Sequence, residues 1–162
     1  MKKRTEMAEF KIGIQKIKEL SFFVNESLGK DCTQAEMNVQ AKLHFDMSSD
    51  SLIFQIAITY ANDQKQLFAS VETLNHFLLD NMAQFQSAKE PDKLDIPEDV
   101  LVLVLSISYS HTRALLASHL NGTAMEQFIL PIINPGQLLK QLNLGITKIE
   151  SNTKEWASID SF

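Results

Sequence analysis

The last third of the chain constrains the fold most, because it joins a long helix, a sharp stop and an apolar crossing. Residues 97–120 begin with Pro97 and two acidic residues, then continue as a run of apolar and small side chains. Proline is tolerated in a first helical turn, and acidic side chains there are stabilised by the helix dipole. Gly122 stands where a left-handed residue ends a helix without a Cβ penalty. The pattern predicts one long helix over 97–120.

The first half of this helix has an alternative. Leu101-Val-Leu-Val-Leu105 has the composition of a strand, because β-branched residues favour strands. We favour the helix because the run continues without a turn into residues 110–120, where Ala and Leu dominate. A strand at 100–108 followed by a shorter helix is the alternative.

The stretch around Pro131 reads as an extended apolar segment that crosses the rest of the fold. Proline donates no backbone hydrogen bond, so this stretch cannot be a central strand. Asn134 is a favourable N-cap, and Pro135 suits the first helical position. We therefore expect a short helix over 137–142, with Gly145 able to end it.

Alternating apolar and polar residues before the long helix predict four antiparallel strands. The predicted strands span residues 10–24, 36–47, 52–60 and 67–79. The first alternates only in part, so we expect a bulge near Gly13 or Lys16. No βαβ pattern is present, so no parallel sheet is expected. Residues 86–93 are polar and read as a linker to the helix.

Composition argues against several classes of protein. The net charge of −5 and the pI near 5.3 are unlike the basic surface of a nucleic-acid-binding protein. No apolar h-region follows the basic residues 2–4, and no stretch reaches the roughly 18 apolar residues of a membrane span. The single cysteine, Cys32, excludes an internal disulfide. We expect a cytoplasmic protein with one domain over 10–145, flanked by tails at 1–9 and 146–162.

Residues capable of catalysis or metal binding are sparse. The spacing of the four histidines, together with Cys32, assembles no zinc site. Cys32 follows Asp31 in a polar stretch without a basic neighbour, so we read it as a plain loop thiol. No glycine-rich phosphate loop and no nucleophile elbow is present. We expect no enzyme, no catalytic residue, no metal and no cofactor.

Several short motifs occur in an order that resembles one known family. They are Phe10-Lys-Ile-Gly-Ile-Gln-Lys-Ile17, Leu20-Ser21-Phe22, Gly122-Thr123, Leu130-Pro131, Asn134 and Leu138. Their order and spacing, over roughly Phe10 to Leu142, resemble the bacterial export chaperone SecB. The resemblance implies an α+β fold: a four-stranded antiparallel meander sheet, then a long helix, an extended crossing segment and a short C-terminal helix.

The resemblance also implies a function. SecB-like proteins are ATP-independent holding chaperones that bind unfolded or non-native polypeptides in apolar grooves for protein export. Long helices would pack between dimers to give a homotetramer. The implied groove lies between the crossing segment, the long helix and the sheet. Its wall residues would be Phe54, Phe68, Phe77, Phe128, Leu130 and Ile132, although plain core packing explains each of them equally well.

A second hypothesis follows from departures from the family pattern. SecB passes clients to the SecA translocase motor through an acidic sheet surface and a polar C-terminal tail. Glu19 stands at one acidic position, Phe23 replaces a second, and Glu72 matches a third only with a register shift. Residues 155–162 do not resemble the acidic tail. A SecB-fold oligomer that binds or regulates one dedicated partner, such as an antitoxin, is therefore the alternative to a general export chaperone.

Overall fold

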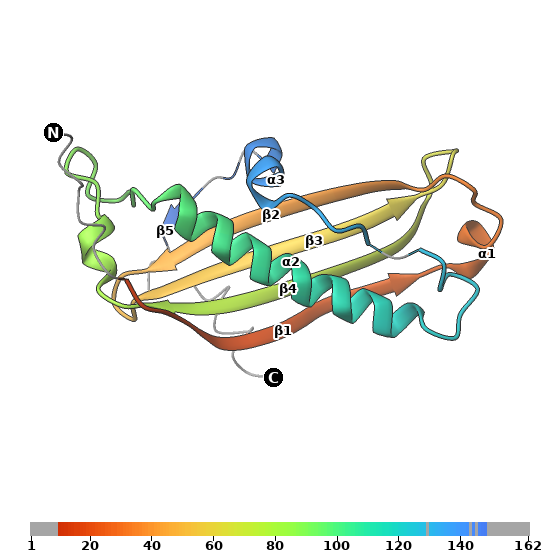
Figure 1. Cartoon of the computed structure of the whole chain (residues 1–162), viewed down its shortest axis with the longest axis horizontal. Helices are drawn as coiled ribbons and strands as arrows, with labels where there is room; N and C mark the ends of the chain where they lie inside the picture. The colour runs from red at the N-terminus through yellow and green to blue at the C-terminus, as the bar shows by residue number, and fades with distance from the viewer. Residues whose placement is uncertain (1–9, 129, 143, 145, 149–162) are drawn as a thin grey trace, which may run out of the picture.

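The computed structural model describes residues 10–128, 130–142, 144 and 146–148. They form one twisted sheet in the order β1-β4-β3-β2-β5, with a long helix lying diagonally across one face (Figure 1). The strands are Ile12–Val24 (β1), Glu36–Asp46 (β2), Ser51–Ala61 (β3), Leu67–Leu79 (β4) and Ile146–Lys148 (β5). The predicted four antiparallel strands and the α+β class are confirmed.

Alternation along the central strands separates the two faces of the sheet. Phe54 and Ile56 in β3 are fully buried on the side of the long helix, which we call the helix face. Gln55 and Ala57 point to the opposite side, which we call the open face. β2 and β3 pair in unbroken register from Glu36 to Asp46. The core lies between the helix face and the helix.

β1 contains two irregularities rather than one. Its register against β4 shifts between Ile14 and Lys16, where a bulge was predicted, and again between Glu19 and Ser21. The second shift was not predicted, because the sequence around it carries no glycine or other breaker. Each shift changes which residues of β1 face the helix.

The sheet has a fifth strand that the sequence analysis missed. β5 pairs in parallel with the end of β2, from Leu43 to Phe45, whereas the four predicted strands pair antiparallel. β5 lies in the stretch 146–162 that was predicted as a tail. Three residues are too short for an alternating pattern to be recognised, so only the fold reveals the strand.

The long helix α2 spans Glu98–Leu120, which confirms the helix and excludes the strand at 100–108. It packs on β3 and β4 along its length. Gly122 follows with a φ of 77°, the left-handed conformation predicted for the residue that ends this helix. Among the described residues α2 is the one helix apolar and long enough to cross a membrane, and its packing on the sheet identifies it as a core helix.

The connections carry more structure than expected. A short helix α1, Glu26–Gly29, follows β1, and Asn25 caps it by accepting a hydrogen bond from the Leu28 amide at 3.4 Å. The 3-10 helix η1, Met82–Phe85, follows β4. In the predicted linker, Gln86 forms an isolated bridge with Leu94. The chain between sheet and helix is therefore folded on itself.

The crossing segment comprises Phe128 and residues 130–134, which have no regular secondary structure, and it leads into α3, Pro135–Leu142. The Gln137 amide donates to Asn134 Oδ1 at 3.1 Å, which confirms the predicted cap. The helix begins at Pro135, earlier than the predicted residue 137. Gly145, the predicted end, lies outside the described residues.

Candidate functional site

The crossing segment runs beside α2 on its way to α3, and two contacts hold it there (Figure 1). The hydroxyl of Tyr109, on α2, donates to the backbone carbonyl of Pro131 at 2.9 Å. The side chain of Leu130 is buried, with 2% of its surface exposed, and belongs to the core. Pro131 has no backbone N–H, so its backbone can only accept hydrogen bonds, and its carbonyl oxygen accepts this one. The segment is thus fixed to the helix that it runs beside.

Three aromatic rings meet where the crossing segment approaches the sheet. The ring centroids of Phe68 and Phe128 lie 5.2 Å apart, and those of Tyr60 and Phe128 lie 6.1 Å apart. Tyr60 and Phe68 stack at 5.9 Å with an angle of 9° between their planes. These separations fall in the range at which aromatic pairs attract one another. Residues from β3, β4 and the crossing segment therefore form one aromatic cluster.

The cluster rests on a close approach between α1 and the segment after α2. A Cβ atom added to Gly29 would lie 2.6 Å from Met125 Sδ and 2.8 Å from Phe68 Cδ2, and closer still to Met125 Cε. Only glycine leaves room for the methionine and the ring at this point. Met125 is fully buried and fills the space between α1 and the aromatic cluster.

A groove of about 600 Å³ opens beside the aromatic cluster. We call it the crossing groove. Its walls include Cys32, Ala35, Met37, Tyr60, Phe128 and Pro131. Phe128 is half-buried, and Pro131 is exposed, so part of this apolar wall faces solvent. The thiol of Cys32 donates to the Gln34 carbonyl at 3.2 Å and is buried, so Cys32 belongs to the groove wall rather than to an open loop.

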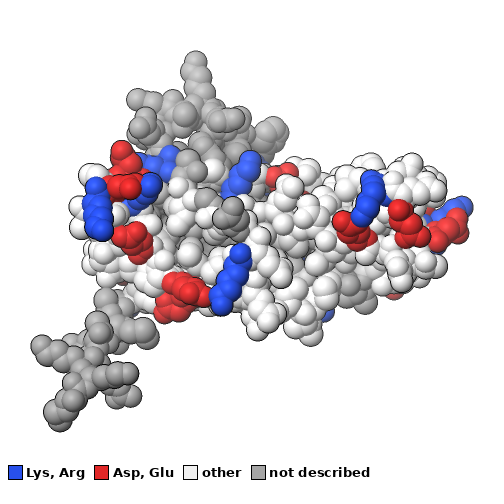
Figure 2. All heavy atoms as spheres, turned by 90° about the horizontal axis from the view of Figure 1, so that it is seen from above, with Lys and Arg blue, Asp and Glu red and all other residues white. Residues whose placement is uncertain are grey.

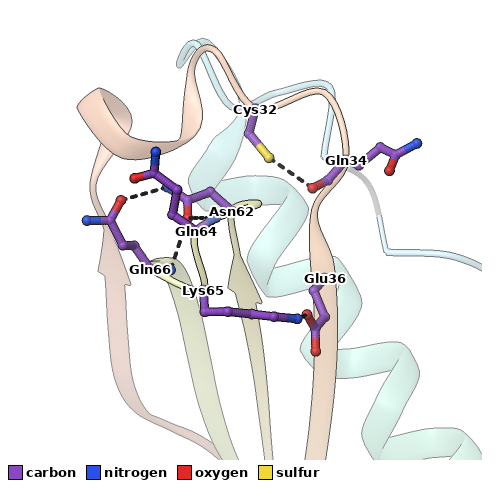
Figure 3. A network of polar contacts seen from close by, with 7 residues as sticks. All are labelled: Cys32, Gln34, Glu36, Asn62, Gln64, Lys65 and Gln66. Carbon is purple, nitrogen blue, oxygen red and sulfur yellow. Dashed lines mark hydrogen bonds and ion pairs between the residues drawn. The ribbon is translucent and has the colours of Figure 1, made fainter.

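A polar network braces the sheet next to the crossing groove (Figure 3). Asn62 Oδ1 accepts from the amides of Gln64 at 3.0 Å and Gln66 at 2.9 Å, which closes the turn between β3 and β4. Lys65 in the same turn forms an ion pair with Glu36 at the start of β2. The turn is therefore attached to the strand that carries Met37.

The groove tyrosines stay neutral hydrogen-bonding groups. Burial, reinforced by the neighbouring Tyr109, raises the pKa of Tyr60 to about 12. Burial also raises the pKa of Tyr109, although the positive charge of Arg113 opposes the rise. A neutral Tyr109 keeps the proton that it donates to Pro131. Neither phenol therefore places a negative charge in the apolar wall at physiological pH.

A smaller hollow of about 130 Å³ lies on the other side of the crossing segment. It is lined by Tyr109 and Arg113 of α2 and by Ile132 and Ile133. Ile132 is 85% exposed, far more than any other large apolar side chain of the described chain. Ile132 therefore leaves a large apolar side chain in solvent next to Pro131 of the groove wall.

The structure separates the six predicted wall residues. Phe68 and Phe128 lie in the aromatic cluster beside the groove, and Ile132 lies exposed beyond it. Phe54 and Phe77 are fully buried between sheet and helix, and Leu130 is buried at the crossing. These three residues pack the core, so they support the groove without forming its open surface.

Of the residues that line the crossing groove, sequence reasoning had predicted only Phe128. Met37 and Tyr60 each alternate with polar residues along their strands, and the strand register pairs them side by side. Their alternation gave the face on which they lie, but not that this part of the face borders a groove. Cys32 and Pro131 lie outside the strands, so alternation could not assign them to the groove wall; their positions depend on how the loops fold.

The two predicted acidic contacts lie on opposite faces of the sheet. Glu19 faces the helix, where its carboxylate is 2.7 Å from Nε2 of His119, and the His119 ring stacks on Phe22 at 4.0 Å. Glu72 faces the open side, where it accepts hydrogen bonds from Gln55 and from Ser21, the latter at 3.4 Å. One flat partner surface cannot contact both carboxylates.

A buried polar chain joins the helix to the sheet. Thr73 Oγ1 lies 2.7 Å from Thr112 Oγ1, and the Thr112 hydroxyl donates to the Ser108 carbonyl at 2.8 Å. Asn75 donates to Thr73 at 3.2 Å, and its Oδ1 lies 3.2 Å from Nδ1 of His111. Buried polar groups need such partners, so this chain fixes how α2 sits on β4. It contributes no open site.

Histidine, cysteine and carboxylate side chains do not gather into a metal site. Within the described ranges no group of three or more such residues lies close enough to hold an ion. His111 and His119 are engaged with Asn75 and Glu19 respectively. The chemistry that the described site offers is apolar and aromatic contact.

Comparison with known proteins supports the fold. No protein-family model and no curated protein sequence matches the chain. The structure is similar to a SecB-like chaperone of Mycobacterium tuberculosis, solved with a ChAD peptide from the HigA1 antitoxin: TM-score 0.53, 12% identity, 75% of this chain and 89% of that chain covered. A Streptococcus agalactiae protein of unknown function aligns at a TM-score of 0.25 and 13% identity, covering 77% of this chain and 100% of that chain, too weakly to carry an argument. The chain thus has a SecB-like fold.

Proposed function

We propose that this protein is an ATP-independent holding chaperone that captures non-native polypeptides in the crossing groove. The observation that carries the proposal is the partly exposed apolar wall of Phe128, Pro131 and Tyr60 beside the exposed Ile132. On the side seen in Figure 2, charged side chains gather in a few clusters and most of the described residues in view are uncharged. The SecB-like fold supports the same assignment.

The groove suits one or two large side chains of an extended client. Each fully buried Leu or Phe side chain gains roughly 1.5–3 kcal/mol on leaving water. That gain depends on apolar area rather than on direction, so it gives low sequence specificity. One groove alone binds weakly, and several grooves on one oligomer add avidity for a single long client.

A homotetramer is part of the proposal. The side of α2 that faces away from the sheet carries Leu103, which is 39% exposed, together with small residues such as Ala114 and Ala117. Small residues let two helices approach closely, and exposed leucines favour burial between copies. Packing of α2 against its copies would place grooves on each side of the assembly.

A cytoplasmic location is proposed with this function, because unfolded clients for a holding chaperone arise where proteins are made. Neither catalysis nor a cofactor is needed for capture by burial. Transfer of clients to the SecA motor is not proposed, since Glu19 and Glu72 lie on opposite faces of the sheet. A role in export therefore rests on the fold alone.

One observation favours the alternative of a single dedicated partner. The structural neighbour from Mycobacterium tuberculosis was solved with a peptide from an antitoxin. By analogy, the crossing groove here would take one defined segment of a partner such as an antitoxin. This alternative predicts tight binding of that segment and no binding of generic unfolded chains.

Suppression of aggregation separates the two proposals. We expect the protein, without ATP, to prevent light scattering by a chemically denatured enzyme that is diluted into buffer. Ile132→Asp should weaken suppression at least about tenfold, which corresponds to roughly 1.4 kcal/mol. The matched control is Ile14→Asp, because Ile14 is also exposed but lies on β1 at the far edge of the sheet.

Equal loss in both isoleucine variants would mean that general hydrophobicity rather than the crossing groove captures clients. No suppression by the wild-type protein would remove the general chaperone and leave the dedicated binder. Circular dichroism of each variant confirms that the fold is intact, as expected for substitutions at exposed positions.

A further inference from the structure

The small hollow beyond the crossing segment lies between one flank of α2 and the chain that leads into α3. Its α2 wall consists of four residues spaced three or four positions apart, which share one face of a helix. They are Ser106, Tyr109, Ser110 and Arg113. Its opposite wall consists of Ile132, Ile133 and Pro135. The hydrogen bond from Tyr109 to the Pro131 carbonyl holds the two walls beside each other.

Arg113 supplies the charge of this hollow and has no described counter-charge. The ion pairs of the described chain involve other residues, and none of the described residues that line the hollow is acidic. Arg113 is half-buried, and its charge lies close enough to Tyr109 to oppose the rise in the pKa of that phenol. A guanidinium with reduced access to water favours an oxyanion, which it binds through two parallel hydrogen bonds.

Other groups around the hollow also favour negative charge. The hydroxyls of Ser106 and Ser110 donate to no acceptor within the described chain, whereas the Thr112 hydroxyl donates to the Ser108 carbonyl. Helix α3 begins at Pro135 in the opposite wall, so the positive end of its dipole lies at the hollow. The hollow thus combines a guanidinium, two hydroxyl donors and the amino end of a helix.

The hollow and the crossing groove lie at neighbouring points of the same stretch of chain. Pro131 belongs to the groove wall, whereas Ile133 and Pro135 belong to the hollow. Two to four residues separate these positions, which is about 7–13 Å of extended chain. An extended polypeptide with an apolar side chain in the groove can therefore reach Arg113 with a side chain two to four positions away.

We propose that the hollow binds a carboxylate of the captured polypeptide, from an Asp or Glu two to four residues away from the apolar residue in the crossing groove. This inference rests on the proposed capture of polypeptides in that groove. The volume of about 130 Å³ suits one small group, since pockets for whole small-molecule ligands are about 300–1,000 Å³. Apolar burial is non-directional, so the carboxylate contact adds a sequence preference that the groove alone lacks.

Two matched peptides test the inference by fluorescence anisotropy. Each has a label and a central pair of phenylalanines in a Gly-Ser sequence, with either Glu or Gln three residues away on both sides. We expect wild-type protein to bind the Glu peptide about fivefold more tightly, and salt to reduce the difference. Arg113→Gln should bind both peptides with the affinity that the wild type has for the Gln peptide. The matched control, Lys89→Gln, removes one positive charge from the exposed loop before α2 and should keep the preference.

The outcomes separate this inference from the proposed function. Equal affinity of the wild type for both peptides, or a Glu preference that Arg113→Gln retains, overturns the inference while groove capture stands. If neither peptide binds, groove capture fails, and an NMR titration with N-acetylglutamate α-amide decides the hollow alone. A saturating shift of the Arg113 Nε–H signal, absent with N-acetylglutamine α-amide, supports the carboxylate site, and no saturating shift overturns it.

Discussion

Substitution of Gly29 tests how the crossing groove is supported. The added methyl group of Gly29→Ala would overlap Met125 Cε and would lie 2.6 Å from Met125 Sδ and 2.8 Å from Phe68 Cδ2. Overpacking of a core costs about 1–3 kcal/mol. Alanine recovers about 0.4–1 kcal/mol by restricting the unfolded chain, so the clash dominates. We expect a net loss of stability and a displaced Met125.

The melting temperature measures this loss. For a chain of this size a change of 1 kcal/mol moves the melting temperature by about 2–4 °C, so a net loss of up to about 2.6 kcal/mol predicts a decrease of up to about 10 °C. Gly13→Ala is the matched control, because no atom lies within 4 Å of the position that its added methyl group would take. If the melting temperature of Gly29→Ala equals that of Gly13→Ala, the close approach at Gly29 does not constrain the fold and the reasoning is refuted. The stability losses of Gly29→Ala and Met125→Ala should not be additive in the double variant, which would confirm the contact between the two positions.

Three further changes give defined outcomes. Tyr109→Phe removes the hydrogen bond to the Pro131 carbonyl, so we expect a loss of about 0.5–1.5 kcal/mol in urea unfolding and faster hydrogen exchange at Ile133. Asn134→Ala removes the cap of α3 and should cost about 0.5–2 kcal/mol; an unchanged stability contradicts the cap. Burial first, and Lys42 second, lower the pKa of His44 in the fold. Stability is then full above the ordinary pKa of about 6.5 and falls at lower pH, so His44→Gln should flatten that decline in melting temperature.

The sequence predicted the parts of the fold that depend on local chemistry. The alternation in β4 gave its bounds correctly, and Gly122 and Asn134 acted as the predicted helix end and helix cap. The helical assignment of Leu101–Leu105 also held against its strand propensity. Packing of the apolar side chains on β3 and β4 outweighs that propensity, as commonly happens in a buried helix.

The groove was predicted less well, because it depends on contacts between distant segments. Phe54, Phe68 and Phe77 are all fully buried, yet among these three only Phe68 packs against Phe128 and Tyr60 of the groove wall. Alternation shows which face a side chain points to, but not where a helix stops covering that face. β5 and the place of Cys32 in the groove wall were not predicted for the same reason, because both depend on contacts between segments distant in the sequence.

The opposite placement of Glu19 and Glu72 also lay beyond the sequence. An unbroken strand would have allowed both carboxylates to be placed from period two alone. The second register shift in β1, after Glu19, reverses which later residues face the helix. Residue spacing alone therefore could not show that these two side chains lie on opposite faces of the sheet.

Calorimetric titration with a permanently unfolded, reduced polypeptide tests the central claim most directly. The account predicts micromolar or tighter binding with a negative heat-capacity change, because apolar client surface leaves water in the crossing groove. Light scattering on the same sample fixes the mass of the oligomer that binds. Absence of binding heat at several temperatures, with the protein folded, would contradict general client capture and leave a dedicated partner as the function to pursue.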